Sequence, residues 1–165
     1  MMKRLSVLAA ALYVLPAFAA LDVRDIALGA KEREIRQKFP SAHCKALEWK
    51  SNAADRRCDD SRVPFGGVEV QVTFYLKKDA LEAFDVRFDT KDLERFVAFL
   101  KTRYGAPQSE EKEAFPRGKD KPRQVYKALW ENGKDRAVLT AQLEKRRASM
   151  LVSRGDFDEE IYRVR

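Results

Sequence analysis

The segment from Val68 to Lys77 alternates strictly between apolar and polar residues, and it constrains the fold more than any other part of the chain. A period of two with one polar side predicts a strand of an antiparallel sheet that is buried on one face and solvated on the other. A second run, through Phe84 and Phe88, follows a polar turn, so the two runs predict a hairpin over 68–88. The apolar side chains expected to face a helix are Val70, Val72, Phe74 and Leu76, with Thr73 and Tyr75 on the opposite face.

After Asp89 the apolar residues recur with helical spacing, which predicts a helix from about residue 90 to Tyr104 that ends at Gly105. Its apolar stripe consists of Leu93, Phe96, Val97, Leu100 and Tyr104. A shorter charged helix is expected over 31–39, where Ile35 and Phe39 share a face, and Pro40 ends it. A strand is expected over 45–49, and the polar residues 50–67 indicate a loop.

The second half of the chain shows weaker strand signals. Residues 108–123 are polar and indicate a connecting loop, followed by strands over 126–130, 137–143 and 150–152 and a short helix after residue 156. Asn132-Gly133 is a strong hairpin-turn signal between the first two of these strands. The predicted fold class is therefore α+β, with short helices packed on one face of an antiparallel sheet. A faint similarity between residues separated by 65 positions, such as Ile35 and Leu100, indicates two tandem helix–sheet units.

The first nineteen residues have the pattern of a secretory signal peptide. Lys3 and Arg4 precede an apolar run over 5–15, and Ala17-Phe18-Ala19 fits the small-x-small rule of signal peptidase. The run is shorter than the roughly 20 apolar residues that a membrane span needs. We therefore expect residues 1–19 to be removed, leaving one periplasmic or secreted domain, 20–165, without a transmembrane segment and with sub-units 20–89 and 90–165. Removal of the two cations lowers the formal net charge from +7 to +5.

Cys44 and Cys58 are the only cysteines of the chain. In an oxidising compartment such an isolated pair is expected to form a disulfide. The alternatives are a reactive thiol or a metal site that includes His43, although no C-x-x-C motif is present. No cofactor is expected.

The stretch Ile26-Ala27-Leu28-Gly29, followed by a charged helix, Phe39-Pro40 and Cys44, resembles a unit of small exported bacterial proteins. It is similar to the unit of secreted β-lactamase inhibitor proteins and of the small lipoprotein of the outer-membrane assembly machine. Tyr104-Gly105-Ala106-Pro107 fits the same helix exit. The resemblance implies a helix packed on an antiparallel sheet and a role in protein–protein binding. It carries over no site residue, and the lipidated cysteine of the assembly lipoprotein is missing.

The sequence contains no hydrolase, metalloprotease, P-loop or dinucleotide-binding motif. Two basic clusters are the candidate binding surfaces. The first comprises Arg117, Lys119, Lys121, Arg123 and Lys127 with Tyr126 and Trp130, and the second comprises Lys145, Arg146, Arg147 and Arg154. Because we expect export, nucleic acid is not an expected partner. The functional hypothesis is a non-enzymatic envelope protein that binds another protein. The alternatives are a binder of anionic envelope glycan or lipid through the first cluster, and a small hydrolase.

Overall fold

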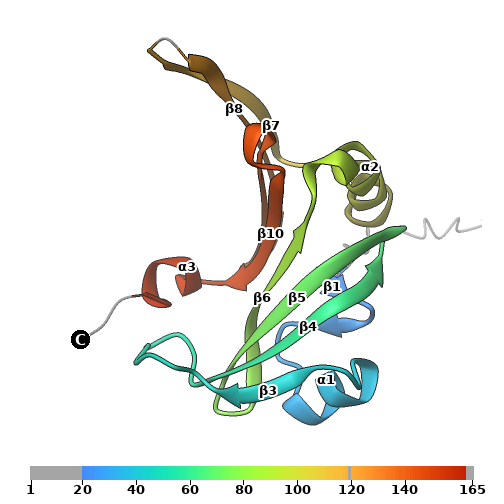
Figure 1. Cartoon of the computed structure of the whole chain (residues 1–165). Coiled ribbons are helices and arrows are strands. Elements are labelled where there is room, and N and C mark those ends of the chain that lie inside the picture. Colours follow the sequence, from blue (N-terminus) through green and yellow to red (C-terminus); the bar gives the residue numbers. More distant parts are fainter. Residues whose placement is uncertain (1–19, 119, 163–165) are drawn as a thin grey trace, which may run out of the picture.

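A computed structural model describes residues 20–118 and 120–162, so the signal peptide predicted over 1–19 lies outside the described residues, as does Lys119. The protein is α+β and dominated by one eight-stranded antiparallel sheet (Figure 1). No helix within the described ranges is both long and apolar enough to cross a membrane. The elements in chain order are β1 Asp22–Val23, β2 Ile26–Ala27, α1 Glu32–Lys38, β3 His43–Ala46, β4 Arg56–Phe65, β5 Val68–Lys77, β6 Ala80–Phe88, the 3-10 turn η1 Thr90–Asp92, α2 Leu93–Tyr104, β7 Ser109–Arg117, β8 Asp120–Asn132, β9 Asp135–Gln142, the 3-10 turn η2 Leu143–Lys145, β10 Arg147–Arg154 and α3 Phe157–Glu160.

The sheet has the strand order β3-β4-β5-β6-β10-β9-β8-β7. Helix α1 is followed by the four-stranded meander β3–β6, and α2 is followed by the four-stranded meander β7–β10. The two meanders join through their last strands, β6 and β10. The offset of 65 noticed in the sequence places β4 at 121–130, within β8, and β5 at 133–142, where β9 lies. The element order of the first half is thus repeated in the second.

One face of the sheet carries the main core. Val72 and Phe74 of β5 belong to a single buried cluster with Phe96 and Leu100 of α2, as the alternation predicts. Helix α1 reaches the same cluster through Ile35. The residue that follows the helix, Phe39, adds an edge-on contact with Phe74, and their ring centroids lie 4.9 Å apart. This burial of apolar surface between helices and sheet is what holds α1 and α2 in place.

The other face is mostly open, and α3 lies against one end of it. Phe157 of α3 packs on Tyr75, with ring centroids 5.5 Å apart, in a second buried cluster that also contains Ala83 and Ile161. Tyr75 therefore lies on the face opposite to Phe74, as predicted. The expectation that the helices share one face fails for α3, because its apolar residues pack against this small cluster.

Two segments that the sequence indicates as loops are strands. Most of 50–67 is β4, and most of 108–123 belongs to β7 and β8. The strand expected over 45–49 lies instead at His43–Ala46. Strand β9 pairs with β8 only from Val125 onward. The residues of β8 that precede Val125 pair with β7 alone, so this end of the β7–β8 hairpin extends as a two-stranded arm (Figure 1).

The predicted disulfide is confirmed. Cys44 of β3 lies directly opposite Cys58 of β4, and the two sulfurs are bonded. The bond therefore ties the short edge strand β3 to the sheet. With both sulfurs in a disulfide, neither cysteine offers the thiolate that a reactive thiol or a metal site would use.

Candidate functional site

The open face of the sheet carries a row of polar side chains that comes from five neighbouring strands. Arg87 of β6 lies opposite Ser149 of β10, and Ser149 lies opposite Thr140 of β9. The row continues to Gln71 of β5 on one side and to Lys127 of β8 on the other. Side chains alternate between the faces of a strand, so the neighbours of these residues, such as Val86 and Met150, point into the core. The register thus brings together residues from both halves of the chain.

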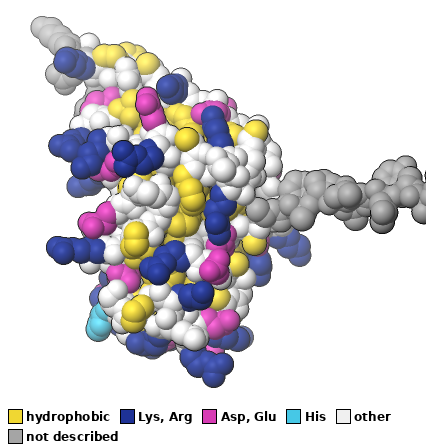
Figure 2. Space-filling view, turned by 90° about the vertical axis from the view of Figure 1, so that its right-hand side faces the viewer, with side chains coloured by type: hydrophobic (Ala, Val, Ile, Leu, Met, Phe, Trp, Pro, Cys, Tyr) yellow, Lys and Arg dark blue, Asp and Glu magenta, His cyan; other side chains and the backbone are white. Residues whose placement is uncertain are grey.

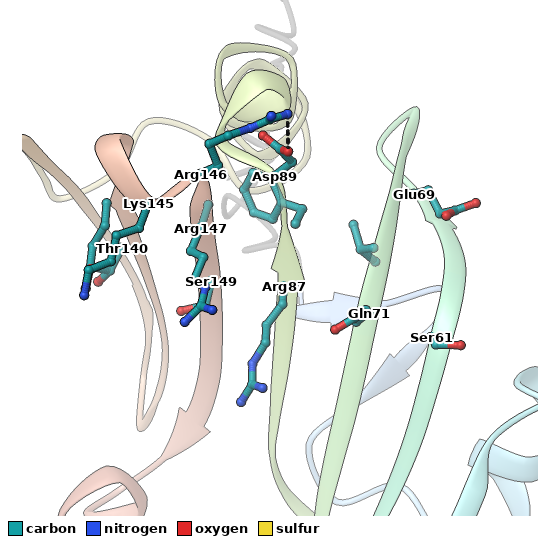
Figure 3. Close-up of a pocket in the computed structure, with 14 residues that line it drawn as sticks. Ser61, Glu69, Gln71, Arg87, Asp89, Thr140, Lys145, Arg146, Arg147 and Ser149 are labelled. Atoms are coloured by element: carbon teal, nitrogen blue, oxygen red, sulfur yellow. Dashed lines mark hydrogen bonds and ion pairs between the residues drawn. The ribbon is translucent and has the colours of Figure 1, made fainter.

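A hollow of about 780 Å³ lies over this row, at the junction of the two meanders. Its floor includes the short side chains of Ser149 and Thr140, while long basic side chains stand around them (Figure 3). Small residues between long ones leave space above the sheet, which explains the hollow. The residues that line it are Ser61, Glu69, Val70, Gln71, Arg87, Phe88, Asp89, Thr140, Gln142, Lys145, Arg146, Arg147, Ala148 and Ser149.

The lining of the hollow is basic, with four cationic residues against two acidic ones. In Figure 3, Arg87, Arg147 and Lys145 extend toward the same end of the sheet, whereas Glu69 points away from them. By contrast, the side of the molecule that carries α1 and α2 shows interspersed basic and acidic side chains (Figure 2). The residues that line the hollow therefore carry a local excess of positive charge.

Two of the four cations in the lining have a carboxylate partner. Arg87 donates from Nε to Asp85 Oδ2 at 2.6 Å, and Arg146 donates from Nη2 to Asp89 Oδ2 at 2.8 Å. Burial raises the pKa of Asp85, and the charge of Arg87 opposes that shift. The pKa of Asp89 is lowered, first by the backbone N–H of Lys91 and then by Arg146.

The other two cations, Lys145 and Arg147, are exposed and have no ion pair within the described part of the chain. Arg147 is the first residue of β10, and Lys145 ends the 3-10 turn before it. Arg146 between them has the left-handed backbone conformation (φ 52°) and turns toward Asp89. Lys145, Arg146 and Arg147 all belong to the second basic cluster noted in the sequence. The cluster's fourth member, Arg154, lies at the other end of β10 and pairs with Asp135.

The first basic cluster, expected to be a binding loop, is distributed along the β7–β8 hairpin. Arg117 ends β7, and Lys119 lies outside the described residues. Lys121 is exposed, Arg123 is half-buried, and Lys127 lies on the open face 3.7 Å from Glu113. Among its described side chains, Lys121 and Lys127 are exposed and Arg123 is not, and Lys127 has a carboxylate neighbour.

The two aromatic residues expected beside this cluster are buried on the helix face. Tyr126 is 3% exposed and Trp130 is 2% exposed. Tyr126 donates to Glu110 at 2.8 Å, and Trp130 donates from Nε1 to the carbonyl of Gly105 at 2.9 Å. Trp130 thus ties the second meander to the end of α2, whereas Tyr126 bonds to β7 within that meander. Because both side chains are buried, they are not available to a partner.

The sequence prediction did not identify Arg87, Ser149 or Thr140 as site residues. The signal for Arg87 was weak, since a charged residue between Val86 and Phe88 is expected on the solvated face of any such strand. Ser149 and Thr140 gave no signal of their own. What assembles them is the pairing of β6 with β10 and of β10 with β9.

Comparisons of the chain with protein-family models, with curated proteins and with solved structures give no match. The assignment of a function therefore depends on the geometry and chemistry of this face.

Proposed function

We propose that this chain is an exported, non-enzymatic envelope protein that binds another protein with the open face of its sheet. The observation that carries the proposal is the contrast between the two faces. Helices α1 and α2 fill one face, while the other presents the basic hollow with two cations that lack a carboxylate partner among the described residues.

The size of the open face supports a protein partner. Eight strands spaced by about 4.8 Å span roughly 34 Å, and strands of eight residues rise about 26 Å. The product is on the order of 900 Å², reduced at one end by α3. A standard protein interface buries about 800 Å² on each partner, so the face is large enough for one. A regular sheet also presents its side chains on a rigid backbone, which lowers the entropy lost on binding.

The location proposed for the protein rests on two independent features. The first is the signal-peptide pattern of residues 1–19, and the second is the disulfide between Cys44 and Cys58, a bond typical of oxidising compartments. The resemblance of residues 26–44 to secreted β-lactamase inhibitor proteins supports protein binding by analogy of fold. The alternative, an anionic glycan or lipid bound by the first basic cluster, loses the support of Tyr126 and Trp130, because both are buried.

Site-specific photo-crosslinking in the native host tests the proposal. A photoreactive amino acid replaces Thr140, on the open face, or Gln37, an exposed residue of α1, as the matched control. We expect a discrete crosslinked protein from position 140 and none from position 37. The proposal fails if the two positions give the same products or if position 140 gives none. Recovery of the protein with the cytoplasmic fraction after osmotic shock would contradict export.

A further inference from the structure

Two cations of the hollow, Lys145 and Arg147, lack the carboxylate partner that several arginines elsewhere in the sheet have. Arg56, Arg136 and Arg154 each contact an acidic side chain within 2.6 Å. Arg147 begins strand β10 as Arg56 begins β4, but it has no such partner within the described residues. Lys145 has none there either. Like charges that stand close together without counter-charges repel each other, so this arrangement costs free energy in the free protein.

The groups that surround the hollow are suited to carboxylates. A guanidinium such as that of Arg147 or Arg87 donates two parallel hydrogen bonds to a carboxylate, and the ammonium of Lys145 adds an adaptable point charge. Ser149 and Thr140 supply hydroxyl donors at the floor. Arg87 retains Asp85 at one edge of its guanidinium and its side chain is still 57% exposed, so it has donors left for a second acceptor.

The volume of the hollow indicates that its ligand is a peptide segment and not a single ion. A hollow of about 780 Å³ is in the range of pockets that hold molecules of several hundred daltons, whereas one inorganic anion would leave most of it filled by water. It is also open to the face on which we propose that the partner lies. A protruding loop of that partner could therefore enter it.

We infer that the hollow receives an acidic segment of the bound protein, whose carboxylates pair with Lys145, Arg147 and Arg87. This inference deepens the proposed function and rests on it. Its basis is charge complementarity with Lys145 and Arg147, which have no ion pair among the described residues, together with the hydroxyl groups of Ser149 and Thr140 at the floor of the hollow.

Binding of a fluorescent oligoglutamate peptide, followed by anisotropy, tests the inference with the full mature chain. The test variant combines Lys145→Glu with Arg147→Glu. The control variant combines Arg33→Glu with Lys134→Glu and changes the net charge by the same amount. Arg33 lies in α1 and Lys134 in the β8–β9 turn, both exposed and without a side-chain partner in the part of the chain that the structure describes.

We expect the test variant to weaken oligoglutamate binding by about tenfold or more, since two charge-assisted contacts are lost. The control variant is expected to bind as the wild type does, and both variants are expected to keep the wild-type melting temperature within a few degrees. Lys145→Ala with Arg147→Ala is expected to give an intermediate loss. Binding by the wild type is expected to weaken with added salt.

Several outcomes would overturn the inference: equal binding of an oligoglutamine peptide, an equal loss in the control variant, or no binding of oligoglutamate by the wild type. Tighter binding of a sulfated glycan than of oligoglutamate would overturn it in favour of a glycan ligand. Failure of the two proposals is distinguishable. A protein crosslinked at position 140 without oligoglutamate binding contradicts only the acidic segment, whereas oligoglutamate binding that needs Arg147, without any crosslinked protein, contradicts only the proposed function.

Discussion

Truncating Phe74 tests the assignment of the two sheet faces. Its side chain is fully buried, and its ring centroid lies 4.9 Å from that of Phe39 and 6.3 Å from that of Phe84. Phe74→Ala is expected to lower the free energy of unfolding by about 3–5 kcal/mol, from lost transfer energy and the cavity left behind. The edge-on contact with Phe39 accounts for about 0.5–1.5 kcal/mol of that loss. Because domains are stable by only about 5–15 kcal/mol, the loss is a large fraction of the total.

Urea denaturation followed by circular dichroism measures this loss. With a slope of about 2 kcal/mol per molar urea, the midpoint is expected to fall by about 2 M. Phe115→Ala is the matched control, because Phe115 lies on the arm with 45% of its surface exposed, and it is expected to cost less than about 1 kcal/mol. If Phe74→Ala does not fold, Phe74→Leu removes less volume and gives a smaller, measurable shift. A near-neutral result at Phe74, or an equal loss at Phe115, would refute the assignment.

Two further predictions concern the disulfide and acid stability. Replacing Cys44 and Cys58 together by Ala is expected to lower the free energy of unfolding by about 3 kcal/mol, the chain-entropy value for a loop of about 15 residues; an unchanged urea midpoint would contradict this. The pKa of Glu32 is lowered, chiefly by its hydrogen bond from Arg56, so the stability it adds is present above its ordinary pKa of 4.5 and is lost as the pH falls through the lowered value. Glu32→Gln is expected to lower the melting temperature near pH 7 and to reduce its fall on acidification; an identical pH profile would show that this pair contributes nothing.

The elements that could be predicted from the sequence are those that bury a complete face. The hairpin over 68–88 and helix α2 were predicted closely, because each has apolar residues at one unbroken period. Strand β4 was missed because a bulge between Asp60 and Val63 shifts its pairing and interrupts the alternation. Strand β7 was missed because it is the outer strand of the sheet and its residues are mostly exposed, so its composition is that of a loop.

The site was less predictable than the fold for a related reason. The charges of Lys145, Arg146 and Arg147 are visible in the sequence, but their relation to Arg87 is not. That relation depends on the register between β6 and β10, which joins residues far apart in the chain and is set by the fit of both meanders to a common core. The burial of Tyr126 and Trp130 has the same origin, because α2 covers them only once the second meander has formed.

The junction of the two meanders also has a consequence for the order of folding. Six of the seven strand pairings in the sheet join consecutive strands, and only the pairing of β6 with β10 closes a long loop. Local hairpins form in microseconds, whereas contacts between distant residues must first overcome the entropy of loop closure. We therefore expect the pairings within each meander to form early and the β6–β10 pairing to form late. Arg87 and Ser149 become neighbours only in that last step, so the basic hollow does not exist in a chain whose second half is unfolded.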